Sequence, residues 1–114
     1  MKKNYSLTYF TDNGMSDEDI RRLLPLYLAD TRDLMGQMEK ARAANNLESL
    51  RMAAHKLKTN FAILGIQAPN PVITRLEEWK QDMAAWNSDP SAALLDPLME
   101  AVHESLAGIQ KDYL

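Results

Sequence analysis

The apolar residues of this 114-residue chain recur mainly at steps of three and four, which is the spacing of one face of an α-helix. The clearest stretch, the central helix, spans about residues 47–66. Its apolar stripe consists of Leu47, Leu50, Ala53, Ala54, Leu57, Phe61 and Leu64. Two later stretches keep the spacing, over Val72, Leu76, Trp79, Met83 and Trp86 and over Leu95, Leu98, Val102, Leu106, Ile109 and Tyr113. Such steps are typical of helices that pack in a bundle.

Caps and prolines predict where the first helices begin. Ser16, with Asp19 three residues later, has the pattern of an N-terminal cap and opens a short helix. Pro25 cannot continue an α-helix without losing a hydrogen bond, so we expect it to open a second helix. Residues 5–10 alternate like a strand but lack a partner strand, so we expect an extended strap there, followed by a turn at residues 11–14.

Prolines also punctuate the second half of the chain. The central helix ends before Pro69 and Pro71, which open the next helix. We expect that helix to carry all the apolar positions up to Trp86. Near the C-terminus we expect a short turn at Pro90 and the main helix from Asp96.

Together these elements predict an all-α fold, an antiparallel up-down four-helix bundle with a short additional N-terminal helix. Residues 1–114 are expected to form a single domain, in which residues 1–15 supply the strap and turn and about residues 16–114 supply the bundle. Because helical bundles serve many functions, the fold class assigns none.

Composition excludes several classes of protein. The chain has no Cys, which rules out a disulfide framework and thiolate metal sites, and its two His have no paired ligand nearby, so we expect no metal site. The formal net charge of −3 argues against a general nucleic-acid binder, whose surface would be basic. Neither a signal peptide nor a membrane-spanning stretch is visible in the sequence. We therefore expect a cytoplasmic monomer.

One histidine lies on the polar side of the central helix. His55 points roughly 150° away from the centre of the apolar stripe, so we expect it to face water. Arg51 at i−4 and Lys58 at i+3 share its face. Their charges disfavour the protonated ring, which favours a neutral nucleophile, and they attract a phosphoryl group. His103 has no such neighbours and is expected to be an ordinary surface residue.

The same face carries more apolar side chains than a face turned toward water requires. Beside His55 lie Met52, Thr59, Ala62, Ile63 and Ile66. Exposed apolar patches usually mark a surface that binds a partner. We therefore expect these five residues, together with Arg51, to bind a partner protein. A bundle that uses this face for docking alone, without covalent chemistry, is one alternative.

The residues around His55 resemble the signature of the histidine-containing phosphotransfer (HPt) domain of two-component phosphorelays. That signature runs His-x-Leu-Lys-Gly, with a second Gly ten residues after the His. The matching residues are His55, Leu57, Lys58 and Gly65. Asn46 stands where the family has an Asp that opens the helix, and Leu76-Glu77 matches a Leu-Glu pair on the following helix. By pattern alone, Glu77 would lie on a solvated face.

This resemblance implies a phosphocarrier with no kinase activity or nucleotide site of its own. Nε2 of His55 would accept a phosphoryl group from the aspartate of one receiver domain and pass it to the aspartate of another. Lys58 would complement the phosphoryl charge, and Arg51 is a weaker candidate for that task. In this family Mg²⁺ belongs to the receiver, so we expect the chain to need no cofactor. The expected partners are receiver domains of response regulators or hybrid sensor kinases.

One position departs from the family and introduces a second alternative. Thr59 stands where the family has a small residue, and it adds bulk beside the imidazole on the approach path of a partner. A Thr at this spacing also resembles the His-Glu-x-x-Thr-Pro box of sensor histidine kinase dimerisation domains. Lys56 and Asn60 replace the acid and the proline of that box, and no glycine-rich ATP-binding stretch is present. These differences favour the phosphocarrier.

Overall fold

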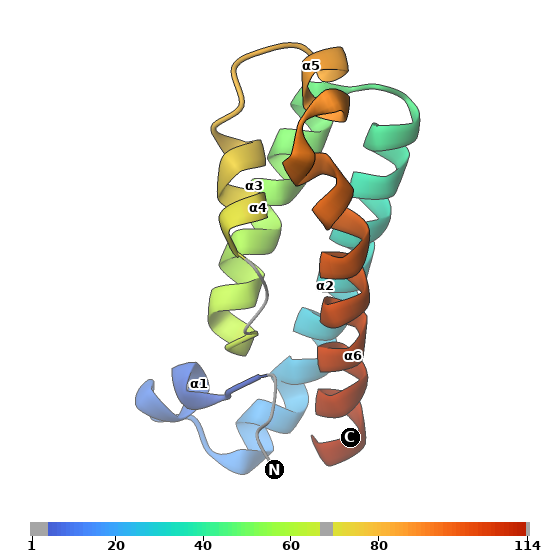
Figure 1. Ribbon diagram of the computed structural model, residues 1–114. Helices are drawn as coiled ribbons and strands as arrows, with labels where there is room; N and C mark the ends of the chain where they lie inside the picture. Colours follow the sequence, from blue (N-terminus) through green and yellow to red (C-terminus); the bar gives the residue numbers. More distant parts are fainter. Residues whose placement is uncertain (1–4, 67–69, 114) are drawn as a thin grey trace.

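The computed structural model describes residues 5–66 and 70–113, and within these ranges the chain forms helices and no strand (Figure 1). The elements are α1 (Thr8–Asp12), α2 (Asp17–Ala43), α3 (Leu47–Leu64), α4 (Asn70–Glu77), α5 (Met83–Ser88), the 3₁₀ helix η1 (Pro90–Leu94) and α6 (Leu95–Tyr113). None of these helices is long and apolar enough to cross a membrane. The predicted all-α class is confirmed. The short helix predicted from Ser16 is not a separate element, because it forms the first part of α2. The break expected at Pro69 lies outside the described residues.

Four helices form the body of the bundle. α2 and α3 pack as antiparallel neighbours, with α6 beside α2 and α4 beside α3 (Figure 1). α5 and η1 cover the end at which α2 connects to α3, and α1 lies at the opposite end (Figure 1). The molecule is elongated, with principal extents of 46, 26 and 21 Å.

A single apolar core runs the length of the bundle. The predicted stripe of α3 is buried in it from Leu50 to Leu64, whereas Leu47 at the helix start is half-buried. The predicted apolar positions between Val72 and Ile109 are buried as well. Each large side chain of this kind stabilises the fold by roughly 1.5 to 3 kcal/mol when fully buried. The apolar spacing in the sequence therefore identified most of the core, whereas Tyr113 at the end of the last stretch is exposed.

Side-chain caps open two of the helices as predicted. The hydroxyl of Ser16 accepts a hydrogen bond from the backbone N–H of Asp19, and the Asp19 carboxylate accepts one from the backbone N–H of Ser16, which is a capping box. Asn46 caps α3 by accepting a hydrogen bond from the backbone N–H of Ser49 (3.1 Å). These caps satisfy N–H groups that have no partner inside the helix.

The helix boundary expected at Pro25 is wrong, because α2 continues through this residue. Pro25 lacks the N–H that would bond to the carbonyl of Arg21, which costs a helix interior about 3 kcal/mol. The buried stripe of α2 nevertheless passes through without interruption, with Ile20 and Leu24 before Pro25 and Leu28 after it. Burial of this face against the core outweighs the local cost.

Residues 5–10 do not form the expected extended strap, because α1 begins within them. The backbone N–H groups of Phe10 and Thr11 both donate to the carbonyl of Leu7, which closes a helical turn. Phe10 is fully buried and packs edge-on against Tyr27, with 5.6 Å between ring centroids. So short an alternation does not distinguish a strand from a helical turn that buries one aromatic residue.

The single helix expected over residues 72–86 is divided in two. α4 ends at Glu77, and Asp82 then caps α5 with a side-chain hydrogen bond (2.8 Å). Trp79 lies in the break and packs edge-on against Trp86, with 5.3 Å between ring centroids. Its indole N–H donates to the carbonyl of Asp82 (3.1 Å). Both tryptophans lie in the core. The buried positions therefore keep the spacing of a single helix in the sequence although a turn separates α4 from α5.

α3 ends at Gly65, the second glycine of the HPt-like signature. Gly65 adopts the left-handed conformation, with φ of 59°, and the backbone N–H of Ile66 donates to the carbonyl of Phe61 (2.9 Å). This is a Schellman-type helix end, which turns the chain and returns the following apolar side chain to the core. The N-terminal segment crosses directly over the turn, where the backbone N–H of Ser6 donates to the carbonyl of Leu64 (3.2 Å).

Replacing Gly65 by Ala should therefore lower the free energy of unfolding by roughly 1 to 3 kcal/mol. The added Cβ would clash with the backbone carbonyl oxygen of Ser6, and the left-handed backbone strains any residue with a side chain. Gly36→Ala, in the exposed middle of α2, is the matched control: its Cβ meets nothing within 4 Å, so it should stabilise by roughly 0.5 to 1 kcal/mol. Urea denaturation measures both. Equal stability of the two variants would contradict this account.

Candidate functional site

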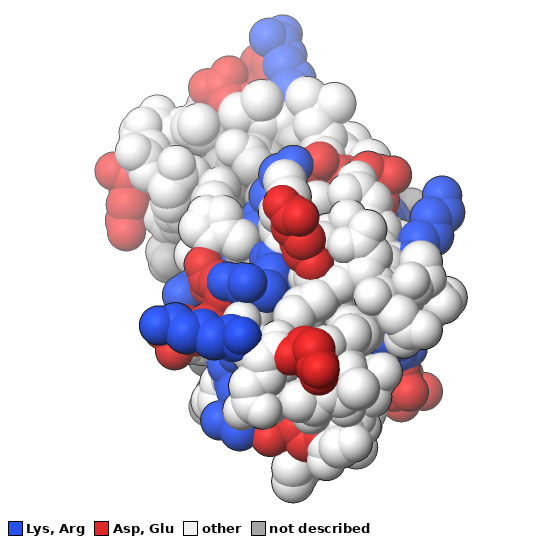
Figure 2. Space-filling view, turned by 90° about the horizontal axis from the view of Figure 1, so that it is seen from above, with Lys and Arg blue, Asp and Glu red and all other residues white. Residues whose placement is uncertain are grey.

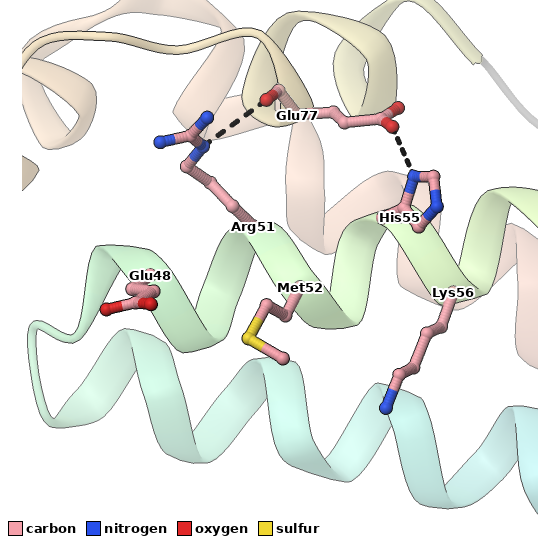
Figure 3. A pocket seen from close by; sticks show the side chains of 6 residues that line it. All are labelled: Glu48, Arg51, Met52, His55, Lys56 and Glu77. Atoms are coloured by element: carbon pink, nitrogen blue, oxygen red, sulfur yellow. Dashed lines mark hydrogen bonds and ion pairs between the residues drawn. The ribbon is translucent and has the colours of Figure 1, made fainter.

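His55 projects from the side of α3 that faces away from the core. Its side chain is 68% exposed, as predicted, while Ala54 and Leu57 on either side of it along the helix are fully buried. Figure 3 shows the imidazole standing clear of the helix beside the end of α4. The ring is therefore accessible to a second protein.

Glu77, which the sequence pattern assigned to a solvated face, lies against this ring. Nδ1 of His55 and Oε1 of Glu77 form a hydrogen bond (Figure 3), and Nζ of Lys58 lies 3.3 Å from Oε2 of the same carboxylate. Glu77 is the last residue of α4, and its side chain is only 23% exposed. In the sequence, Glu77 was marked only as part of the Leu-Glu pair that resembles the HPt family. That pair did not predict its contact with His55.

These two donors lower the pKa of the Glu77 carboxyl group below its ordinary value of 4.5. The hydrogen bond with His55 is the larger cause, Lys58 adds to it, and partial desolvation opposes it. The carboxylate is therefore ionised at neutral pH and can only accept hydrogen bonds. It follows that Nδ1 of His55 carries the proton, which leaves the lone pair of the neutral ring on Nε2.

Arg51 reaches across from α3 to α4. Its Nε donates to the backbone carbonyl of Glu77 (3.3 Å), and the side chain is only partly exposed (Figure 3). Of the two cations expected beside His55, Lys58 thus contacts the carboxylate and Arg51 contacts the main chain of one and the same residue. The end of α4 is bound to α3 at both places.

A hollow of about 410 Å³ opens beside the imidazole, on the side toward the start of α3. It is lined by Glu48, Arg51, Met52, His55, Lys56 and Glu77 (Figure 3). Met52 is 55% exposed, and methionine is a flexible, polarizable residue that adapts to varied binding partners. The hollow suits the docking of an apolar side chain of another protein next to the ring.

The structure places four of the five predicted contact residues on the face of His55. Met52, Thr59 and Ala62 are exposed, and Ile63 is half-buried against the core. The expected exposure of Ile66 is wrong, because this side chain is only 5% exposed. The turn at the end of α3 takes Ile66 off the helical face and into the core. The exposed patch is therefore smaller than the helical spacing predicted.

Asn60 is a buried polar residue whose part in the structure the sequence analysis missed. Its Nδ2 donates to Oδ2 of Asp30 (2.9 Å) and to Oγ1 of Thr31 (3.1 Å), and the Thr31 hydroxyl donates to the carbonyl of Tyr27 (2.7 Å). A slip of α3 along α2 would leave the buried amide of Asn60 without these partners, which is costly. This cluster therefore fixes the position of α3, and of His55, along the axis of α2. The only indication of this cluster in the sequence was a polar residue, Asn60, next to Phe61 of the apolar stripe.

Within residues 5–66 and 70–113, other charged groups form no comparable site. His103 is exposed on α6, and within the two described ranges no three His, Cys, Asp or Glu side chains are placed to hold a metal ion. At the end of the molecule that carries α5, positive and negative side chains lie side by side among uncharged ones (Figure 2). This end therefore presents no broad field of a single sign to a partner.

Comparison with protein families adds an independent finding. A family model described as the Hpt domain matches residues 22–111, which include all of α3 and α4. Comparisons with curated proteins and with solved structures gave no match.

Replacing His55 by Ala should raise the pKa of the Glu77 carboxyl group toward 4.5, because it removes the largest cause of the lowering. Lys58→Gln should give a smaller rise, and Lys56→Gln none. The ¹³C NMR titration of the Glu77 carboxyl carbon measures these shifts. A titration that is identical in the wild-type and His55→Ala proteins would contradict the contact.

The same contact makes stability depend on pH. Because the pKa of Glu77 is lower in the folded protein, the contact stabilises the fold above pH 4.5 and stops doing so as the pH falls through the folded-state pKa. The difference in unfolding free energy between wild-type and His55→Ala proteins should therefore shrink as the solution is acidified. Urea denaturation at several acidic pH values checks this, and a difference that grew instead would have the wrong sign.

Proposed function

Because the chain belongs to the Hpt domain family, we propose that Nε2 of His55 accepts a phosphoryl group from the aspartate of one receiver domain and passes it to another. Members of this family act in histidine phosphotransfer with receiver domains, as carriers and not as kinases. The observation that supports the choice of His55 is its contact with Glu77.

The Glu77 contact prepares the ring for nucleophilic attack. With the proton held on Nδ1 by an ionised carboxylate, the lone pair is on Nε2, which points away from Glu77 (Figure 3). The hydrogen bond also fixes the orientation of a side chain that is otherwise exposed. A ring held in one tautomer and one orientation loses less freedom on reaching the reacting geometry.

The proposed transfer balances without water, nucleotide or redox partner. The Nε2 lone pair attacks the phosphorus of an aspartyl phosphate, the N–P bond forms, and the P–O bond to the carboxylate breaks with its electron pair leaving on the aspartate. The ring becomes cationic and keeps its Nδ1 proton, whose charge Glu77 balances. In the second transfer an aspartate oxygen attacks the phosphorus, the N–P bond breaks, and the ring is neutral again.

Lys58 is the cation that complements the phosphoryl charge in this proposal. It lies one turn after His55, is about half exposed, and already holds its ammonium 3.3 Å from Oε2 of Glu77. Rotation of its flexible side chain brings the ammonium toward phosphoryl oxygens while it stays near the carboxylate. We expect the receiver to supply Mg²⁺, so that this chain contributes positioning and electrostatics.

We assign receiver docking to the exposed residues around the ring. Met52 lines the hollow, while Thr59, Ala62 and Ile63 continue the surface along α3. Thr59 lies one turn after His55, on the path by which a receiver approaches Nε2. An apolar patch surrounding a reactive ring excludes water from the contact and orients the two reacting groups.

Replacing His55 by Gln should abolish phosphoryl acceptance and leave helix content nearly unchanged, because an exposed side chain contributes little to packing. The assay incubates the protein with a phosphorylated receiver and measures label that is labile in acid and stable in base. His103→Gln is the matched control and should be labelled normally. Label on the His55→Gln protein would show that the acceptor is elsewhere. A wild-type protein that binds the receiver but takes no label would identify a docking module instead.

Replacing Met52 by Glu should weaken receiver binding by roughly 1 to 3 kcal/mol without unfolding the bundle. Leu94→Glu is the matched control, because Leu94 is 52% exposed but lies on η1, outside the hollow. Titration calorimetry with the receiver measures both affinities. Equal losses in the two variants would mean that the Met52 surface is not the docking site.

Replacing Ile66 by Glu, by contrast, should unfold the protein, because the side chain of Ile66 is buried and the substitution would place a charge in the core.

A further inference from the structure

We propose that Arg51 is a positioning residue for phosphotransfer, which binds the end of α4 and thereby keeps the Glu77 carboxylate against Nδ1 of His55. This inference rests on the proposed function of His55. It replaces the expectation that Arg51 meets the phosphoryl group directly, since its Nε already donates to the Glu77 carbonyl (3.3 Å).

The end of α4 needs such a bond. The last four carbonyls of an α-helix have no partner inside the helix, and Glu77 is the last residue of a helix of only eight residues. Isolated helices of this length are unstable, and their final turns open easily. Arg51 supplies both a donor to the terminal carbonyl and a positive charge at the negative end of the helix dipole.

Two successive turns of α3 therefore hold Glu77 at two points. Arg51 binds its main chain, and His55, four residues later, binds its side chain (Figure 3). With the backbone fixed, only the side-chain torsions of Glu77 remain free to carry the carboxylate away from the ring. Without Arg51, an exposed imidazole and an exposed lysine would have to hold the carboxylate in competition with water, and exposed pairs of this kind are weak.

The orientation of Arg51 separates this role from direct contact with a phosphoryl group. Its side chain is partly buried and is directed at the main chain of α4, whereas Lys58 is more exposed and lies at the carboxylate. Nε2 of His55 points away from Glu77, and hence away from the carbonyl that Arg51 binds (Figure 3). Arg51 thus acts through Glu77, and its effect should vanish when the Glu77 carboxylate is absent.

The first test needs no phosphoryl donor. The ¹⁵N NMR shifts of the His55 ring in the unphosphorylated protein report which nitrogen carries the proton. We expect the Nδ1-protonated tautomer to dominate in the wild-type protein, to be retained in Arg51→Lys, and to give way to a mixture of tautomers in Arg51→Met. Lys56→Met, which removes a cation from the same hollow, should leave the tautomer unchanged. An unchanged tautomer in a folded Arg51→Met protein overturns the proposal, as does equal mixing in Lys56→Met.

The second test is a double-mutant cycle on the rate of transfer from a phosphorylated receiver. Arg51→Met should slow transfer roughly three- to tenfold in the wild-type background and have no further effect in a Glu77→Ala background. Equal slowing in both backgrounds would assign Arg51 to the phosphoryl group and overturn the proposal. If even the wild-type protein takes no label, the proposed function fails, while the tautomer measurement still decides whether Arg51 positions Glu77.

Discussion

Burial of one face of α3 is the interaction on which the remaining geometry depends. An α-helix repeats every 3.6 residues, so burying Leu50, Leu57 and Leu64 determines the direction of every other side chain on the helix. His55 is thereby turned out of the core. The hydrogen bonds of Asn60 to α2 then fix the helix along its own axis. The imidazole is exposed at a defined place because the opposite face of its helix is held firmly.

α4 converts this exposed ring into a prepared one. It packs on α3 and ends beside the imidazole, so that its last residue faces His55. In the resulting polar cluster, Arg51, His55 and Lys58 all bind one residue, Glu77. Its parts come from two helices whose relative position is set by apolar burial, so the site inherits its rigidity from the core. Preorganisation of this kind suits a reaction that depends mainly on positioning and electrostatics.

Much of the fold follows from local signals in the sequence. The stripe of α3, the caps at Ser16 and Asn46, and a last helix that starts one residue before Asp96 were all predictable, because periodicity and capping act over a few residues. The helix boundary predicted at Pro25 is wrong because the local penalty of this residue is compensated by burial elsewhere along α2. The division between α4 and α5 was not predictable from apolar spacing because both tryptophans remain in the core on either side of a turn.

The candidate site was predictable only where it depends on the geometry of α3 alone. The exposure of His55 and the proximity of Lys58 follow from helical geometry on one helix. Glu77 lies 22 residues from His55 in sequence, and its contact depends on where α4 ends and how it packs. The burial of Ile66 depends on the backbone conformation of Gly65, which removes the next residue from the helical repeat. Distances between helices, and the point at which a helix stops, are properties of packing that periodicity alone does not contain.

Trp79 and Trp86 are the only tryptophans of the chain, and they lie together at the corner between α4 and α5. The tryptophan fluorescence of the protein therefore originates at one corner, just beyond Glu77. The indole N–H of Trp86 has no hydrogen-bond partner among the residues described, so Phe can replace it without breaking a hydrogen bond. Trp79 would then be the sole tryptophan, with the guanidinium carbon of Arg75 at 5.2 Å from its ring centroid. Its emission would report changes at the end of α4, with no dye attached.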